Sequence, residues 1–284
     1  MEIRQFRFHV GLPREVRLLH TTDNHLCLAD ERDGARKIAL AKNRAEAFGA
    51  SADVLCERFR ASVAYAKENR LLYLSTGDIL DFVSLANLEF ARQTLEGCDY
   101  LMAAGNHEYS LYVGEAWEDE AYKQQSFALV QSYFKPNLVF DARIVGGVNF
   151  VTLDNVYYNF TAYQLMRMKE EAKKGFPIIL CVHTPFYAPK LYDFMMETDG
   201  SCAYLTAAPE EKIACYNAHR YRQQKADAAT LAFVDFASHE PSVCGIIAGH
   251  CHHPFADTLS WYRKVPMLVG GAGCSGCAAE IIID

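Results

Sequence analysis

The chain has 284 residues, 51% of them hydrophobic, and a formal net charge of −7. This length and apolar content suffice for a large core, so we expect residues 1–284 to form a single domain. The negative charge argues against a broad nucleic-acid-binding face and makes nucleic acid an unlikely partner. Charges interrupt the first 16 residues where a signal peptide needs an apolar stretch, and no apolar run reaches the roughly 18 residues of a spanning helix, so we expect a cytoplasmic location and no membrane contact.

The first half of the chain alternates predicted strands with predicted helices. Alternating residues over 2–10 predict a strand, Pro13 breaks the pattern, and 16–21 predicts a second strand that ends in Asp23 and His25. Residues 28–50 are polar and Ala-rich, which is typical of an exposed loop and helix or of a lid. Over 51–69 the spacing predicts a helix with Ser51 as N-cap and an apolar face, composed of Val54, Leu55, Phe59, Val63 and Ala66.

A buried strand over 71–74 follows this helix and ends in Gly77, Asp78 and Asp81. The unit then repeats with a helix over 84–97 and a strand over 100–104, which ends in Gly105-Asn106-His107-Glu108. Beyond it the sequence predicts a helix over 110–135, strands over 138–140 and 148–153 with 156–160 as a further candidate, a helix over 163–174, and a strand over 177–182 that leads to His183.

Residues 186–221 form the least regular stretch and are rich in aromatic side chains. A segment of this length in a compact domain is typical of a lid that contacts substrate, and the alternative is a surface excursion with a small apolar cluster of its own. A helix over 222–239 and a strand over 243–248 follow, and this strand leads to His250 and His252. Two last strands, over 267–269 and 280–283, with a Gly-rich loop between them, indicate a hairpin or a sheet edge.

Ten cysteines are present, and only Cys274 and Cys277 are closely spaced. Without an export signal, all ten are expected to be reduced thiols rather than a disulfide framework. The CxxC pair has no second pair of cysteines or histidines to complete a zinc site. We therefore expect a loop of small packed residues around it rather than a metal or redox site.

The polar residues at five predicted strand ends are of the types that ligate metal ions. Side chains two apart in an extended backbone point the same way, so Asp23 and His25 can converge on one ion. Asp78 follows a buried strand beside a glycine, where a carboxylate can bridge two cations, although a turn carboxylate bonded to nearby N–H groups has the same pattern. Because the carboxyl ends of strands in an α/β sheet lie together, groups far apart in sequence can meet there.

The order of these motifs resembles that of the calcineurin-like metallophosphoesterase superfamily, whose signature runs D-x-H, G-D-x-x-D, G-N-H-E/D, H and G-H-x-H. The resemblance extends from Asp23 to His252. It implies an α/β fold, a four-layer α/β/β/α sandwich in which two facing mixed β-sheets are flanked by helices. It also implies a metal-dependent phosphoric ester hydrolase with two metal ions, for which nitrogen and oxygen ligands suit Mn, Fe or Zn.

Carried over by position, the resemblance assigns two sets of metal ligands that share Asp78. One set is Asp23, His25, Asp78 and His252, and the other is Asp78, Asn106, His183 and His250. A hydroxide bridging the two ions would attack phosphorus, and His107 would stabilise the transition state or protonate the leaving oxygen. The resemblance makes Asp78 and His107 the catalytic residues, and Asp81 and Glu108 residues that orient the histidines.

The expected substrate is a small phosphorylated molecule, with a phosphodiester favoured. No arginine lies next to any of the five motifs, whereas phosphate monoesters usually gain from a guanidinium clamp, although a distant arginine such as Arg220 or Arg263 could fold in. Asp81 stands where purple acid phosphatases have a tyrosine ligand, which disfavours that branch. The alternatives are a phosphomonoesterase or nuclease of the same fold, or a non-catalytic metal-binding scaffold.

Overall fold

The computed structural model describes residues 1–115 and 120–284 as two β-sheets with helices outside them. The five-stranded sheet has the order β1-β11-β2-β3-β4, and the six-stranded sheet has the order β5-β6-β7-β8-β10-β9. The strands are β1 (Glu2–Phe8), β2 (Val16–Thr21), β3 (Leu72–Ser75), β4 (Tyr100–Met102), β5 (Phe140–Val145), β6 (Val148–Leu153), β7 (Ile178–Val182), β8 (Val243–Ala248), β9 (Phe255–Ser260), β10 (Lys264–Val269) and β11 (Cys277–Ile283).

Both sheets are mixed. In the first, β2, β3 and β4 are parallel neighbours, and β11 runs parallel to β1 and antiparallel to β2. In the second, β6, β7, β8 and β10 are parallel, and β5 and β9 are antiparallel edge strands. The facing surfaces share one apolar core, in which Leu18 and Leu74 of the first sheet lie in the same cluster as Phe150 and Ile179 of the second. Burial of this interior holds the two sheets face to face.

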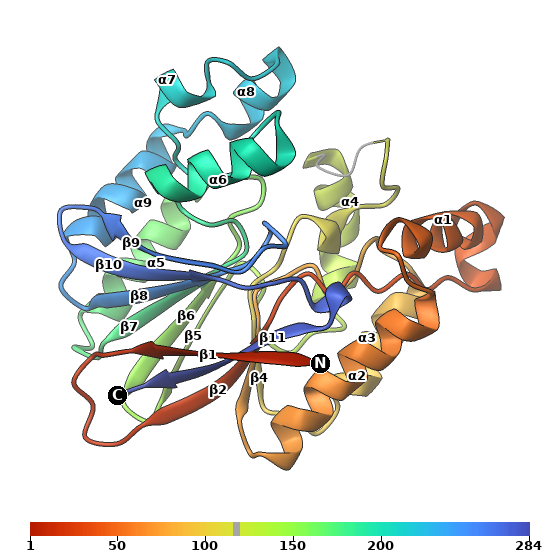
Figure 1. Ribbon diagram of the computed structural model, residues 1–284, viewed down its shortest axis with the longest axis horizontal. Coiled ribbons are helices and arrows are strands. Elements are labelled where there is room, and N and C mark those ends of the chain that lie inside the picture. The colour runs from red at the N-terminus through yellow and green to blue at the C-terminus, as the bar shows by residue number, and fades with distance from the viewer. Residues whose placement is uncertain (116–119) are drawn as a thin grey trace.

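Helices cover the two outer faces, as Figure 1 shows. The α-helices are α1 (Gly34–Ala47), α2 (Ala52–Glu68), α3 (Leu85–Leu95), α4 (Glu120–Gln131), α5 (Ala162–Ala172), α6 (Pro189–Asp199), α7 (Glu210–Ile213), α8 (Ala218–Gln224) and α9 (Ala228–His239). Phe59 of α2 and Leu88 of α3 pack against the five-stranded sheet, and Met168 of α5 and Phe233 of α9 pack against the other. This arrangement confirms the predicted α/β sandwich.

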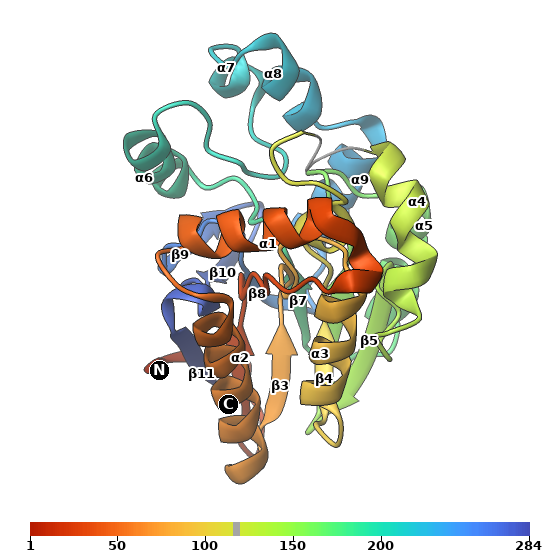
Figure 2. The same ribbon diagram turned by 90° about the vertical axis from the view of Figure 1, so that its right-hand side faces the viewer.

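Five strands end at one edge of the sandwich and lead into the predicted ligand motifs. They are β2, β3 and β4 of one sheet and β7 and β8 of the other. Three short helices, α6 to α8, gather beyond this edge at the top of Figure 1, and α1 lies across the ends of α2 and α3 in Figure 2. All seven predicted ligands therefore lie in loops at this edge of the sandwich.

Several predicted strands are wrong or incomplete. Residues 156–160 form a loop rather than a strand, in which Val156 N donates to Asp154 Oδ1. The predicted strand over 138–140 is mostly displaced, because β5 begins at Phe140 and its Gly146-Gly147 turn closes a hairpin with β6. Strand β9 lies outside the sequence predictions and forms a hairpin with β10. Strand β11 lies between β1 and β2 in the other sheet, so the expectation of a terminal hairpin or a sheet edge is wrong.

The helix predictions need three corrections. The predicted helix over 110–135 is shortened to α4, its first residues are not helical, and residues 116–119 lie outside the described part. The stretch 186–221 is more regular than expected because it contains α6, α7 and the start of α8. The predicted helix over 222–239 is divided in two, since Asp227 caps a new helix, α9, by accepting from Thr230 N. On α2 the N-cap Ser51 is confirmed, but Val54 is exposed.

All ten cysteines are free, and Cys274 lies in a short 3₁₀ turn where it packs with Cys27 and Ala272. This agrees with the expected loop of small packed residues. Within the described ranges, no helix combines the length and apolar character that a membrane span requires.

Candidate metal centre

Loops after β2, β3 and β4 bring the first group of polar side chains together. Two of these loops touch at glycines: a Cβ on Gly77 would lie 2.7 Å from Gly105 Cα, and a Cβ on Gly105 would lie 2.9 Å from Asp78 Cγ. Gly77 also has a φ of +99°. The close approach therefore requires glycine at both positions, and it places Asp78 beside the loop that carries Asn106.

Glu108 connects these loops through hydrogen bonds with their backbone N–H groups. Its buried carboxylate accepts hydrogen bonds from Asp78 N at 2.7 Å, Gly105 N at 2.6 Å and Leu80 N at 3.1 Å. Burial and the charge of Asp78 raise the pKa of Glu108 to about 7. Glu108 thus positions the backbone of two loops, and the expectation that it orients a histidine is wrong.

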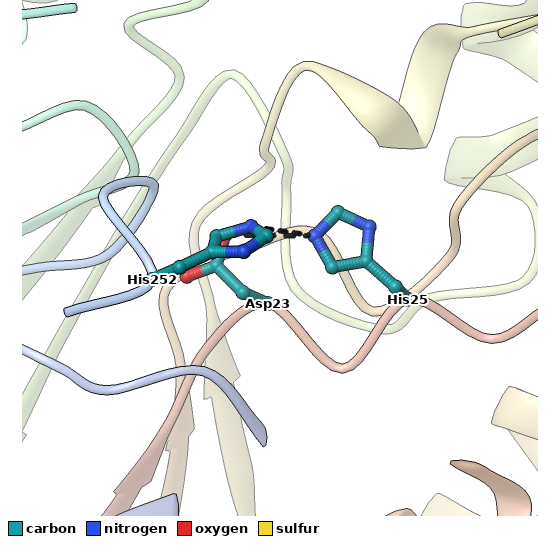
Figure 3. Close-up of side chains that lie close together, drawn as sticks. All are labelled: Asp23, His25 and His252. Carbon is teal, nitrogen blue, oxygen red and sulfur yellow. Dashed lines mark hydrogen bonds and ion pairs between the residues drawn. The ribbon is translucent and has the colours of Figure 1, made fainter. Parts of the chain in front are cut away.

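Three of the predicted ligands form one cluster beside β2 and β8. One ligand atom each from Asp23, His25 and His252 lies within 4.8 Å of the others. The Nε2 atoms of His25 and His252 are 3.0 Å apart and face each other, as Figure 3 shows. Asp23 Oδ1 is 3.5 Å from His252 Nε2 and is buried without a hydrogen bond.

A second cluster contains Asp78, His183 and His250. His183 Nε2 lies 3.3 Å from Asp78 Oδ2, 3.1 Å from His250 Nδ1 and 3.1 Å from Asn106 Oδ1. Asp78 Oδ2 is also 3.9 Å from His25 Nε2 in the first cluster. The Asp78 carboxylate is therefore the group that the two clusters share, as expected of a bridging ligand.

The donor atoms fit a pair of cations. Each cluster holds imidazole nitrogens only about 3 Å apart, an arrangement that a cation between them would satisfy. The buried, unpartnered Asp23 Oδ1 is a carboxylate oxygen directed into such a position. Burial lowers the pKa of His252 to about 4 and the pKa of His250 well below its ordinary value, whereas for His183 burial is outweighed by the charge of Asp78, which raises the pKa to about 9.

Five of the seven predicted ligands have left-handed backbone conformations. They are Asp23, His25, Asp78, His250 and His252, with φ between +48° and +71°. Such conformations are unfavourable for residues with a Cβ atom and concentrate at functional sites. The loops have therefore adopted unfavourable backbone geometry in order to turn these side chains inward.

His107 lies next to both clusters, and one of its ring nitrogens lies within 4.8 Å of ligand atoms of His25 and Asp78, so these three residues form a further group that could hold an ion. The backbone N–H of His107 donates to Asp78 Oδ1 at 2.8 Å. The ring nitrogen Nδ1 lies 2.7 Å from the backbone carbonyl oxygen of Asp81 and 3.2 Å from Asp81 Oδ1. Burial opposes protonation of the ring, but the charges of Asp78 and Asp81 outweigh it and raise the pKa of His107 to about 10. The ring is thus held in its protonated form, as a proton donor would be.

Asp81 contacts a second histidine as well, since Asp81 Oδ1 is 3.0 Å from His25 Nδ1. The sequence motif predicted this orienting contact, but Arg44 was missed. Its guanidinium donates to both oxygens of Asp81, from Nε at 2.7 Å and from Nη2 at 3.0 Å. Arg44 belongs to α1, far from any motif in sequence, so no spacing pattern could have indicated it.

A cavity of about 280 Å³ opens onto the centre. Its lining consists of Asp78, Asn106, His107, Met195, Asp199, Tyr204, His250, Cys251, His252 and His253. Three of these residues, Met195, Asp199 and Tyr204, come from the segment 186–221, so part of this segment lies beside the cavity. Not all aromatic residues of the segment face this cavity, because Phe186 is buried in the core, where it stacks on Phe160.

Tyr158, from the loop that was predicted as a strand, also reaches the centre. Its Oη is 3.5 Å from His250 Nε2, and the Tyr204 ring centroid is 5.9 Å from that of the same histidine. Two histidines lie outside the five motifs but near the sheets' common edge. His253 lines the cavity, whereas His20 is buried between the sheets.

Comparison with known structures supports the fold. A purple acid phosphatase from yellow lupin (Lupinus luteus) has a TM-score of 0.50 at 13% identity, and the alignment covers 94% of this chain and 45% of the lupin chain. A dimetal phosphatase from Danio rerio has a TM-score of 0.47 at 12% identity, with 91% and 88% coverage, and a 5'-nucleotidase precursor from Thermus thermophilus has 0.41 at 14%, with 95% and 54%. This chain spans less than half of the lupin chain.

No curated protein matches the sequence. The model of the calcineurin-like phosphoesterase family, whose members are metal-dependent phosphoric ester hydrolases with a dinuclear metal centre, matches residues 16–254. That range contains every predicted ligand and His107. The chain therefore belongs to the calcineurin-like phosphoesterase family.

Proposed function

We propose that this protein hydrolyses a small phosphodiester at two metal ions held by seven side chains: Asp23, His25, Asp78, Asn106, His183, His250 and His252. The observation that carries the proposal is the position of Asp78, whose Oδ2 lies 3.3 Å from His183 Nε2 in one cluster and 3.9 Å from His25 Nε2 in the other. When bound, the ions supply an activated water and neutralise charge on the phosphoryl oxygens.

The protein's own side chains do the rest of the chemistry. Asp78 and Asn106 are the proposed ligands of the five-stranded sheet that line the cavity, and His107 donates a proton to the leaving oxygen. Its Nδ1 is engaged by Asp81, so the opposite ring nitrogen is the one that serves the leaving group. Tyr204 and Met195 offer an apolar wall for the leaving alcohol in the same cavity.

The charge of the cavity favours a diester. None of the ten residues that line it, all within the described ranges, is a lysine or an arginine, and Asp199 adds a carboxylate. Of the two distant arginines considered above, Arg263 donates to the backbone carbonyl of Glu240, and Arg220 lies over the Tyr204 ring at 5.1 Å. A diester carries one negative charge and a monoester carries close to two, so the monoester loses more from this surrounding.

The test compares two chromogenic substrates with the same leaving group. Metal-loaded enzyme should cleave bis-p-nitrophenyl phosphate with a higher kcat/KM than p-nitrophenyl phosphate. The variant Asp199→Asn, which removes the cavity carboxylate and keeps its size, should narrow the difference by improving the monoester. Lys190→Gln on the exposed side of α6 serves as the matched control.

Two results would count against the proposal. A higher kcat/KM for the monoester would indicate a monoesterase in which Arg220 turns toward the substrate. Equal effects of Asp199→Asn on both substrates would show that the charge of the cavity does not select between them.

A further inference from the structure

The C-terminal turn of α1 packs against side chains of the proposed metal centre. Arg44 and Phe48 are four residues apart, so they lie on the same side of the helix end. Arg44 reaches Asp81, and the Phe48 ring stacks on the His25 ring at 4.5 Å between centroids and 24° between planes. The Arg44 guanidinium itself lies 5.0 Å from the Phe48 ring centroid. The helix thus contacts a predicted ligand both directly and through a carboxylate.

Asp81 has to satisfy three partners with two oxygens. Oδ1 is 3.0 Å from His25 Nδ1, 3.2 Å from His107 Nδ1 and 3.0 Å from Arg44 Nη2, while Oδ2 accepts from Arg44 Nε at 2.7 Å. The planar fork of the guanidinium fixes the plane of the carboxylate, and with it the direction of Oδ1. Arg44 therefore sets the direction of Oδ1 toward both histidines, and the backbone carbonyl of Asp81, 2.7 Å from His107 Nδ1, holds that ring as well.

Burial makes this dependence strong. Asp81 is fully buried, and a carboxylate in that environment requires a permanent positive charge, which Arg44 provides with a side chain that is 24% exposed. The other two partners, His25 and His107, are imidazoles, which lack the fixed charge of a guanidinium. Arg44 is the partner whose charge is constant.

The second cluster is oriented by different means. His183 Nδ1 lies 2.7 Å from the backbone carbonyl of Thr76, and Tyr158 Oη lies 3.5 Å from His250 Nε2. Neither contact involves Asp81 or α1. A change at Arg44 should therefore reach one cluster and not the other.

On this basis, and resting on the ligand assignment of the proposed function, we propose that Arg44 is a positioning residue that acts through Asp81. It holds His25 in its ligating orientation for the ion bound by Asp23, His25 and His252, and it holds His107 toward the leaving group. The other ion shares the ligand Asp78 with the first, but its remaining ligands Asn106, His183 and His250 make no contact with Asp81 that would pass on a change at Arg44.

The test measures metal binding to each site separately, without turnover. Manganese is titrated calorimetrically into metal-free protein carrying His183→Asn, which leaves the His25 site, or His252→Asn, which leaves the other. Adding Arg44→Gln should weaken binding in the His183→Asn protein by about 10- to 100-fold, the usual effect of losing an outer partner of a ligand. It should change binding in the His252→Asn protein by less than about threefold.

Lys42→Gln, an exposed substitution on the same helix, is the control and should alter neither site. Arg44→Lys restores the charge but not the two-point fork, so it should recover only part of the affinity; it also carries the test if Arg44→Gln fails to fold. Equal weakening of both sites, or full affinity in either Arg44 variant, would overturn the proposal. Failure of the wild type to bind two ions would instead refute the ligand assignment.

Turnover gives a second readout. In otherwise unmodified enzyme saturated with manganese, Arg44→Gln should lower kcat more for poor leaving groups than for p-nitrophenolate, because a misdirected His107 matters only where a proton is needed. A uniform loss of kcat across leaving groups would contradict a role through His107.

Discussion

The two sheets contribute different chemistry to the same centre. Among the proposed ligands, loops of the five-stranded sheet carry two carboxylates, one amide and His25, whereas loops of the six-stranded sheet carry only the imidazoles of His183, His250 and His252. Neither group forms either complete ligand set. Because each proposed ligand set needs residues from both sheets, the packing of the two sheets, and not any one loop, determines whether ions can bind.

The largest effect is expected where the two halves share a ligand. Asp78→Asn keeps the shape of the side chain and its tolerance of a left-handed backbone but removes the bridging charge. We expect reduced occupancy of both ions and a loss of activity on the order of 10³-fold, the upper range for a single electrostatic group. His252→Asn, in the imidazole half, should remove one ion only. Elemental analysis of both proteins makes the comparison, and one ion retained firmly in Asp78→Asn would contradict it.

A second substitution separates binding from chemistry within the five-stranded half. His107→Ala should lower kcat by roughly two orders of magnitude while both ions stay bound, because a general acid is lost and no ligand is. Substrates with a good leaving group should lose less. Steady-state kinetics combined with elemental analysis test this, and a loss of metal would show that His107 is itself a ligand.

Removal of the ions should loosen the connection between the halves. Because each ion is held by loops from both sheets, binding favours the folded protein, by about 2.7 kcal/mol for one site at a free ion concentration of 100 times Kd. Differential scanning calorimetry with added manganese and then with a chelator should show a drop in Tm of several degrees. Asp78→Asn should show little dependence on either addition. An unchanged Tm in the wild type would mean that the ions do not link the sheets.

His20 allows the most specific test, since it is an imidazole at the contact of the two sheets but outside the site. Its Nε2 is 2.8 Å from Thr76 Oγ1, and a Cβ on Gly270 of the opposite sheet would meet its ring. Burial lowers the pKa of His20 to about 3. The unfolded chain therefore takes up this proton below about pH 6.5, while the folded protein does so only near pH 3.

The stability from this group is consequently lost as the pH falls from 6.5 toward 3, by about 1.4 kcal/mol per pH unit. In urea unfolding over this pH range, His20→Gln should show a shallower decline in the free energy of unfolding than the wild type. The exposed His219→Gln is the control. Parallel declines in all three proteins would exclude His20 as a source of the acid sensitivity.

The sequence predicted the parts of the site that follow strand ends. Asp23, His25 and Asp78 could be found because a buried strand followed by a ligand-type residue is a local pattern, and the family resemblance joined the five patterns. Arg44 and Tyr158 could not, because each reaches the site through tertiary packing that leaves no spacing in the sequence. The terminal hairpin failed for the same reason, since the Gly270–Gly276 segment allows β11 to cross to the other sheet, a choice made by packing.

The left-handed backbone of five ligand residues has a consequence for directed evolution. A selection for heat resistance carried out without metal would favour glycine at Asp23, Asp78 or His252, since glycine has no Cβ atom and relieves about 1 kcal/mol of conformational strain at each position. Such a selection would remove the proposed metal ligands, and with them the activity, while it raised the stability of the fold, as in other trade-offs between stability and activity. Libraries of this protein should be screened with metal present, so that the ligands contribute to the property under selection.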